Sequence, residues 1–212
     1  MNAVIDTTRS VVLNNISWKS YKQIADALQD ETPAHLTYDR GRLEILVLSF
    51  YHENMKKLVA TLFERLSDNL GIEICAAGST TFQRDDLERA FEPDESYYIE
   101  NAEYMRGRKV VNLDFDPPPE LSIEIDVSAS SVNRMKIFAA VGIREVWRYS
   151  DSEMTFSLLR DGIYESVAKS NALPEVSCHA VGELLEFGLT STRKQFLARI
   201  DEYTNRSPTT DE

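Results

Sequence analysis

Cysteine is scarce in this sequence: Cys75 and Cys178 are the only two in 212 residues. Two scattered cysteines do not make a disulfide framework, and reduced thiols are the rule in the cytosol. No run of residues approaches the roughly 18 apolar residues of a membrane span. The first residues show no basic segment followed by an apolar one, as a secretory signal would. These absences predict a cytoplasmic protein that has no membrane partner.

Positive charge is also in short supply. The chain has 35 acidic residues against 23 lysines and arginines, and its formal net charge is -12. Affinity for nucleic acid comes largely from lysine and arginine side chains that neutralise phosphates, so this protein should not coat DNA non-specifically. Binding to DNA would need a local basic patch or a basic partner. Two clusters are candidates, with solvated surface as the alternative: Lys56 with Lys57, and Arg106 with Arg108 and Lys109.

The motifs of several enzyme classes are missing as well. The sequence holds no glycine-rich phosphate loop, no Gly-x-Ser-x-Gly elbow and no CxxC pair. His35 and His179 have no partners at catalytic or zinc-binding spacing. These absences leave the acidic residues as the main candidates for chemistry.

The patterns that are present describe one domain. Residues 17–203 alternate between strand and helix patterns without a dividing linker, residues 1–16 are predicted to be a flexible segment, and residues 204–212 a disordered tail. Gly41 marks a hairpin turn, and an amphipathic stripe predicts a helix that ends at Gly71. The stripe comprises Met55, Leu58, Val59, Leu62, Phe63, Leu66 and Leu70. The order of elements predicts an α/β (α+β) fold, with a mixed β-sheet flanked by helices.

Acidic residues interrupt two of the strand patterns, EPDESYYIE and LSIEIDVSAS. Because side chains alternate along a strand, Glu92 shares a face with Asp94, and Glu124 shares a face with Asp126. If the strands are neighbours, the carboxylates converge, and two unit charges about 4 Å apart repel by about 4 kcal/mol at an effective dielectric of about 20. Such a cluster needs a cation, a shared proton or open water, and its hard oxygen ligands favour Mg²⁺ or Mn²⁺. Acids that face solvent at a strand start or a wet sheet edge are the alternative.

These residues also carry a resemblance to a known family. Pro93-Asp94 at a strand start, followed by Glu124-x-acid on a later strand, is similar to the PD-(D/E)XK nuclease signature. The stretches GSTTFQRDDLERAFEPDESYYIEN, LSIEIDVSASSVNRMKIFAAVGIREVWRY and LLRDGIYESVAKSNALPEV together resemble the Uma-type family of putative restriction endonucleases, a branch of that superfamily. The resemblance covers roughly residues 17–200. It implies a restriction-endonuclease-like fold and a Mg²⁺ site.

The resemblance assigns site residues position by position. Asp94 and Glu124 match the two metal-binding acids, and the backbone carbonyl of Ile125 would be a third ligand. Asp126 stands where the general motif has its lysine, and it would bind a second ion or orient the attacking water. His52, Glu53 and Glu92 are possible accessory residues. For His52 and Glu53 the alternative is a capping histidine and an acid favoured by the helix dipole.

The lysine of the motif is replaced in much of the family by a lysine on the following helix. That helix position aligns with Arg134 here, and Lys136 is two residues away. Two residues are about 200° apart around a helix, so Arg134 and Lys136 cannot both face the site. Either would stabilise charge at the phosphate. Arginine cannot act as a general base, because it stays protonated.

The predicted function is therefore a Mg²⁺-dependent (or Mn²⁺-dependent) DNA endonuclease. In this hypothesis a water activated at the metal site of Asp94 and Glu124 attacks the phosphate in line. A homodimer is expected, because most oligomers are two-fold symmetric and a cut in both strands needs two sites. The alternative is a binding or assembly protein that has the nuclease fold without activity. Tyr97, Tyr98 and Trp147 would then serve an interface, although such strand residues more often belong to the core. An enzyme that acts on another phosphoester is a third possibility.

Overall fold

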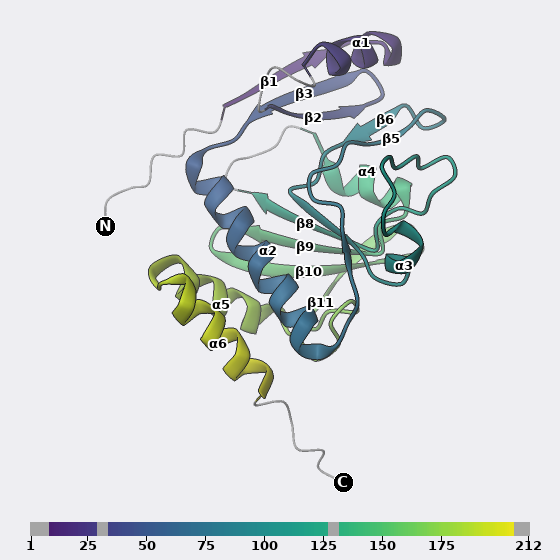
Figure 1. Ribbon diagram of the computed structural model, residues 1–212. Coiled ribbons are helices and arrows are strands. Elements are labelled where there is room, and N and C mark those ends of the chain that lie inside the picture. Colours follow the sequence, from purple (N-terminus) through teal and green to yellow (C-terminus); the bar gives the residue numbers. More distant parts are fainter. Residues whose placement is uncertain (1–8, 29–33, 127–131, 206–212) are drawn as a thin grey trace.

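The computed structural model describes residues 9–28, 34–126 and 132–205. These residues form two β-sheets that lie one above the other in Figure 1, with helices above, beside and beneath them. Parts of the predicted flexible segment and of the predicted tail, residues 1–8 and 206–212, lie outside the described residues.

The N-terminal sheet is antiparallel, with the strand order β1-β3-β2-β6-β5. Its strands are β1 (Arg9–Asn14), β2 (Ala34–Asp39), β3 (Arg42–Val47), β5 (Phe82–Arg84) and β6 (Arg89–Phe91). The prediction that residues 1–16 are irregular is wrong over Arg9–Asn14, because all six residues of β1 pair with β3. The backbone of β3 supplies the hydrogen-bond partners that order this stretch, and the local sequence of the stretch does not indicate them.

The predicted hairpin is confirmed as β2 and β3. Their register pairs Asp39 with Arg42 at the turn. Arg40 and Gly41 occupy the turn with positive φ angles of 43° and 98°, a conformation that glycine adopts without steric cost. Helix α1 (Trp18–Leu28) packs on one face of this hairpin.

The second sheet is mixed, with the strand order β11-β10-β9-β8-β7-β4. Its strands are β4 (Cys75–Ala76), β7 (Glu95–Tyr98), β8 (Leu121–Asp126), β9 (Glu145–Ser150), β10 (Glu153–Arg160) and β11 (Ile163–Val167). Only the β8–β9 pair is parallel within the described strands. This sheet confirms the predicted mixed β-sheet, whereas the separate N-terminal sheet was not predicted.

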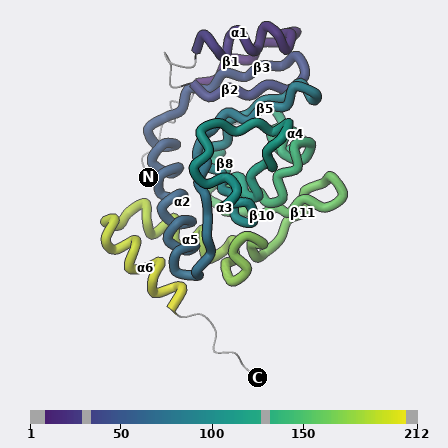
Figure 2. Tube along the Cα trace, turned by 45° about the vertical axis from the view of Figure 1, so that its right-hand side comes forward, coloured from purple at the N-terminus to yellow at the C-terminus, as the bar shows by residue number. Residues whose placement is uncertain are grey.

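Helices flank the mixed sheet. They are α2 (Phe50–Leu70), α3 (Ala102–Met105), α4 (Arg134–Val141), α5 (Cys178–Thr190) and α6 (Arg193–Asn205). The predicted apolar stripe lies on α2, which ends at Gly71 with a positive φ of 68°. In Figures 1 and 2, α2 runs beside the sheet with α5 and α6 against its lower part.

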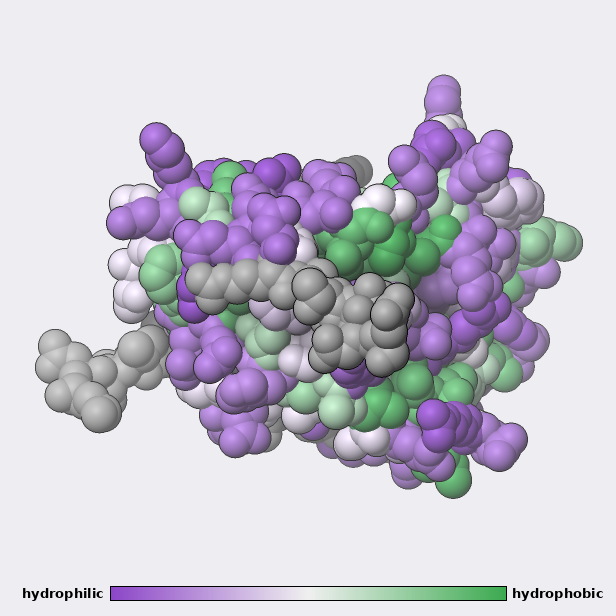
Figure 3. Space-filling view, turned by 90° about the horizontal axis from the view of Figure 1, so that it is seen from below, coloured by the Kyte–Doolittle hydropathy of each residue, from purple (hydrophilic) through white to green (hydrophobic). Residues whose placement is uncertain are grey.

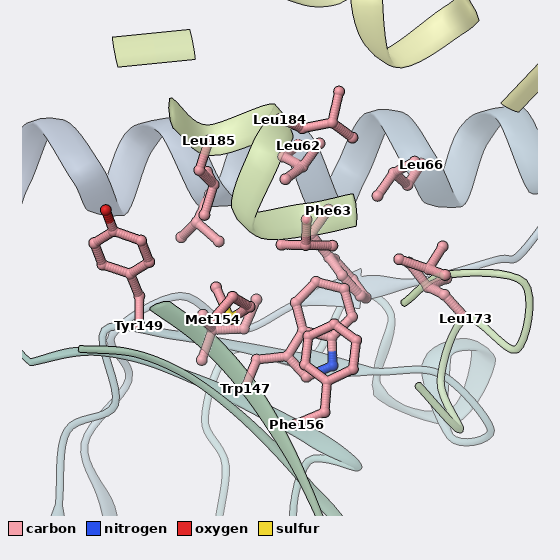
Figure 4. Packing of buried hydrophobic residues seen from close by; sticks show 14 of the residues in the cluster. Leu62, Phe63, Leu66, Trp147, Tyr149, Met154, Phe156, Leu173, Leu184 and Leu185 are labelled. Carbon is pink, nitrogen blue, oxygen red and sulfur yellow. The ribbon is translucent and has the colours of Figure 1, made fainter. Parts of the chain in front are cut away.

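Aromatic side chains fill the space between α2 and the mixed sheet. Phe63 on α2 lies 4.3 Å from Tyr97 and 5.4 Å from Trp147, measured between ring centroids. Trp147 stacks on Phe156 at 4.2 Å, as Figure 4 shows. Tyr97, Tyr98 and Trp147 are all buried, so the idea that they form a protein interface is wrong.

The surface of the protein is mostly polar. The face seen from below in Figure 3 shows hydrophilic residues around smaller hydrophobic patches. None of the described helices has both the length and the apolar character needed to cross a membrane.

Candidate functional site

The candidate site lies where the chain passes from one sheet to the other. β6 belongs to the N-terminal sheet and β7 to the mixed sheet, so the three residues between them, Glu92 to Asp94, cross from one sheet to the other. The end of β8, the start of α2 and the start of α4 approach the same place. The predicted alternation of Glu92 and Asp94 along one strand is wrong, because β7 begins only at Glu95.

Asp94 is held by two groups. Its side chain is buried, with 2% of the residue exposed. Oδ2 accepts a hydrogen bond of 2.7 Å from the backbone N–H of Ile125 and lies 3.1 Å from Nε2 of His52. Burial raises the pKa of Asp94, but the hydrogen bond and charge of His52 and the charge of Arg134 lower it more, so its pKa is below the ordinary value. Asp94 is therefore ionised at neutral pH, and neither contact uses its Oδ1.

Glu124 lies in the strand β8 beside Asp94. It is 3% exposed, and its Oε2 accepts a hydrogen bond of 2.5 Å from Nη1 of Arg134. Burial raises the pKa of Glu124 to about 7, Arg134 opposes this shift, and the charge of Asp94 adds to it. Two buried carboxylates thus repel each other, and an added positive charge between them would favour the ionised form of Glu124.

Arg134 faces the site, and Lys136 does not. Burial lowers the pKa of Arg134, but the charges of Glu124 and Asp94 raise it more, so the guanidinium stays charged. The side chain of Lys136 is exposed and borders a groove between α4 and the β10–β11 hairpin, together with Gly162. The possibility that Lys136 supplies the charge in the site is therefore excluded by its position on the helix.

A comparison with protein-family models gives the context for these residues. The model of the Uma2 family, described as "Putative restriction endonuclease", matches residues 18–190. The chain belongs to the Uma2 family. A comparison with curated proteins found no match. The crystal structure of a putative nuclease belonging to DUF820 from Anabaena variabilis is similar, with a TM-score of 0.56 and 14% sequence identity, over 80% of this chain and 99% of that chain. This likeness confirms the predicted restriction-endonuclease-like fold.

The other acids predicted for this Uma2 site lie at its margin. Asp126 ends β8 and forms an ion pair with Arg148 of β9. Glu92 accepts hydrogen bonds from the backbone N–H of Leu36, at 3.3 Å, and from Oγ1 of Thr81, at 2.8 Å. The side chain of Glu53 is about half exposed. The structure thus brings Asp94 and Glu124 together and gives Asp126 and Glu92 partners of their own.

His52 is part of the site, as expected for an accessory residue. Ser49 caps the start of α2 by accepting a hydrogen bond of 3.2 Å from the backbone N–H of His52. Burial lowers the pKa of His52, but its hydrogen bond to Asp94 and the charge of Asp94 raise it more, so the pKa is above the ordinary value. The helix cap therefore fixes the histidine that in turn fixes Asp94.

The sequence analysis did not place three further residues in the site: His35, Glu44 and Lys56. The charge of Glu44 acts on Arg134, and the charges of Asp94 and Lys56 act on the pKa of His35, which burial lowers. Lys56 is only 7% exposed. It follows His52 by four residues and so shares its helix face. Polar residues at buried positions of β2 and β3 were the available signal, but the burial of those positions depends on the second sheet.

The two basic clusters differ in burial and in pairing. Lys56 is buried while its neighbour Lys57 is exposed. Arg106 pairs with Glu73 at 2.7 Å, and Arg108 pairs with Asp116 at 2.9 Å. Arg106 and Arg108 are therefore paired with acids of the same chain, which weakens the positive charge that their cluster would offer to DNA.

The residues present fit a Mg²⁺ ion bound by few protein ligands. Within the described ranges, no three His, Cys, Asp or Glu side chains are grouped to hold a metal ion. Mg²⁺ in phosphate-processing sites usually takes one or two carboxylates and keeps several waters. Asp94 and Glu124 are the two carboxylates that would hold the ion, with the backbone carbonyl of Ile125 as a third ligand, and the ion would add positive charge beside a Glu124 whose pKa is raised mainly by burial.

Proposed function

We propose that this Uma2 chain is a Mg²⁺-dependent endonuclease that hydrolyses phosphodiester bonds of DNA, with Mn²⁺ as an alternative ion. The observation that supports it best is the buried pair of Asp94 and Glu124, held at the end of β8 by the 2.7 Å hydrogen bond from the N–H of Ile125. An ion bound by these two carboxylates and the carbonyl of Ile125 would lower the pKa of a water molecule and stabilise charge on the phosphate.

The protein's own residues have separate tasks in this proposal. His52 orients Asp94 through the contact to Oδ2 and keeps its pKa low, so that the carboxylate is ready to bind a cation. Arg134 holds Glu124 at 2.5 Å. Because arginine stays protonated, Arg134 stabilises negative charge at the phosphate but takes no proton from water.

Cleavage assays test the proposal. Wild-type protein is incubated with DNA and with RNA, in Mg²⁺, Mn²⁺ or EDTA, beside an Asp94→Ala/Glu124→Ala variant. We expect cleavage of DNA by the wild type with either ion, none in EDTA and none by the double variant. Glu183→Ala, which removes an exposed acid on α5, is the matched control and should cleave normally. Cleavage that survives in the double variant would refute the site.

An inactive binding or assembly protein with the same fold is the second candidate. Two observations favour it: Arg134 already neutralises Glu124, and Arg148 already neutralises Asp126. Calorimetry with Mg²⁺ and Mn²⁺ separates the candidates. Absence of ion binding together with absence of cleavage would establish the inactive form, whereas ion binding that disappears in Asp94→Ala/Glu124→Ala supports the enzyme.

We also propose a cytoplasmic homodimer as the form that cuts both strands of a duplex. A two-fold dimer presents two identical sites, one for each strand. Light scattering of the purified protein gives the mass in solution, to be compared with 24.2 kDa for one chain. A strictly monomeric protein would limit the activity to single cuts or require assembly on DNA.

A further inference from the structure

The polar face of β2 carries buried polar atoms for which the described residues provide no hydrogen-bond partner. Thr37 is 1% exposed, and its Oγ1 has no hydrogen-bond partner within residues 9–28, 34–126 and 132–205. The Nδ1 atom of His35, two residues earlier on the same face, is also buried and without a partner. Buried polar groups are nearly always satisfied, so each exception indicates a missing partner, a water or a ligand.

Register and charge place this face opposite the candidate site. Thr37 pairs with Glu44 of β3, so the two side chains share one face. The charge of Glu44 acts on Arg134. The N–H of Leu36, between His35 and Thr37, donates to Glu92, two residues before Asp94. β2 therefore borders the segment that carries Asp94, and its polar face is turned toward the site.

Two further buried atoms without partners belong to the same place. Nδ1 of His52 and Nε of Arg134 have no hydrogen-bond partner, so four of the eight such atoms in the described residues surround the site. The Nε of arginine can only donate a hydrogen bond, so its partner must be an acceptor such as oxygen. Lys56 and Arg134 lie close enough for their positive charges to lower the pKa of His35 and of Glu92, which flank this place. An oxyanion satisfies both requirements.

We propose that Thr37 and His35 form, with Lys56, a binding subsite for a phosphate oxygen of the nucleic-acid strand, across the site from Asp94 and Glu124. The inference rests on the proposed nuclease function, and it adds the N-terminal sheet to the residues that position the substrate. Arg134 lies between the two halves, anchored to Glu124 through Nη1, with Nε left to donate to the phosphate.

The variant Thr37→Val tests the subsite, with inorganic phosphate as the probe. Valine has nearly the shape of threonine, so it removes the hydroxyl without opening a cavity. Because that hydroxyl has no partner, the variant should unfold at the same temperature as the wild type or a higher one. Its affinity for phosphate, measured by calorimetry in Mg²⁺, should fall about 3- to 10-fold, the value of one neutral hydrogen bond. Thr37→Ser, which keeps the hydroxyl, should bind phosphate like the wild type.

Tyr21→Phe is the matched control. The hydroxyl of Tyr21 is also buried without a partner, but Tyr21 packs with Tyr38 on the opposite, α1-covered face of the same sheet. This variant should keep both stability and phosphate affinity. If Thr37→Val lowers the unfolding temperature and leaves phosphate affinity unchanged, the hydroxyl serves a structural water and the subsite is refuted. A wild-type protein that binds no phosphate refutes it as well.

Failure of the subsite and failure of the nuclease give different results. Cleavage of a DNA oligonucleotide with an unchanged KM in Thr37→Val, together with unchanged phosphate affinity, refutes the subsite and leaves the nuclease intact. Absence of cleavage with phosphate binding that Thr37→Val weakens refutes the nuclease and supports the subsite. A raised KM of Thr37→Val for the oligonucleotide shows that the subsite binds a phosphate group of the DNA strand and not only free inorganic phosphate.

Discussion

The two faces of the strand β2 bury side chains of opposite character. On the α1 side, Tyr38 stacks on Tyr21 with ring centroids 4.9 Å apart, and Leu36 and Leu43 complete an apolar cluster. On the other side lie His35 and Thr37, which no apolar cluster contains. Both faces carry buried side chains, but only the α1 face gains hydrophobic free energy from the burial. This difference supports the inference that the polar face of β2 serves a function other than stability.

The largest expected effect is a loss of DNA cleavage when a residue of the candidate site, which the polar face of β2 borders, is changed. Replacing Asp94 by Asn keeps its shape but removes the charge that the proposed ion needs. We expect cleavage of DNA to fall by about a thousandfold, because the charge stabilisation that an ion supplies is worth several kcal/mol. Single-turnover cleavage assays measure it, and the free energy of unfolding should also fall, because the variant loses the buried ion pair with His52. Near-normal cleavage by the variant would show that Asp94 is not a ligand.

A change on the apolar, α1-covered side of β2 should act on the stability of the protein. Tyr38→Ala removes a buried ring and its 2.8 Å hydrogen bond to the carbonyl of Ile16. We expect the free energy of unfolding to fall by about 3–5 kcal/mol, as for other large-to-small changes in a core. Urea denaturation measures the loss. If the loss were below about 1 kcal/mol, the contrast between the two faces would not hold.

The pH dependence of stability sharpens the comparison further. Burial raises the folded-state pKa of Glu124 from 4.5 to about 7. The folded protein therefore holds this proton more tightly, and without metal the free energy of unfolding should fall by a few kcal/mol as pH rises from about 4.5 to above 7. His52, whose pKa is raised, acts in the same direction. Glu124→Gln should remove most of this slope in urea titrations across that range, and an unchanged slope would contradict the assignment.

The smallest expected effects are those of substitutions at Arg134 and Lys136, two residues of α4. Arg134→Met leaves Glu124 without its counter-ion, and we expect a loss of about 1–3 kcal/mol at pH 8 and reduced cleavage. The loss is moderate because the pKa of Glu124, which is about 7 with Arg134 present, rises further without it, so the carboxyl group takes up a proton at little cost. Lys136→Met, at an exposed position, should change stability by less than about 0.5 kcal/mol and leave cleavage intact. Equal effects of the two variants would place Lys136 in the site as well.

Local patterns carried much of the prediction. The stripe on α2, the β2–β3 hairpin and the acids of β8 depend on neighbours within a few residues, so periodicity and turn chemistry were sufficient for them. The strand β6 was missed because its three residues become a strand only by pairing with β2 and β5. The irregular reading of Arg9–Asn14 failed for the same reason, since β3 supplies its partners.

The sequence by itself determined that Asp94 stands at the start of one strand pattern and Glu124 within a later one. It also determined that the lysine of the nuclease motif is absent. Tertiary structure alone decided that Arg134 rather than Lys136 faces these acids, and that His35, Thr37 and Lys56 border them. The physical reason is that charges act through space. A carboxylate acquires its pKa and its partners from groups that lie near it in the folded protein, and these come from strands and helices far apart in the chain.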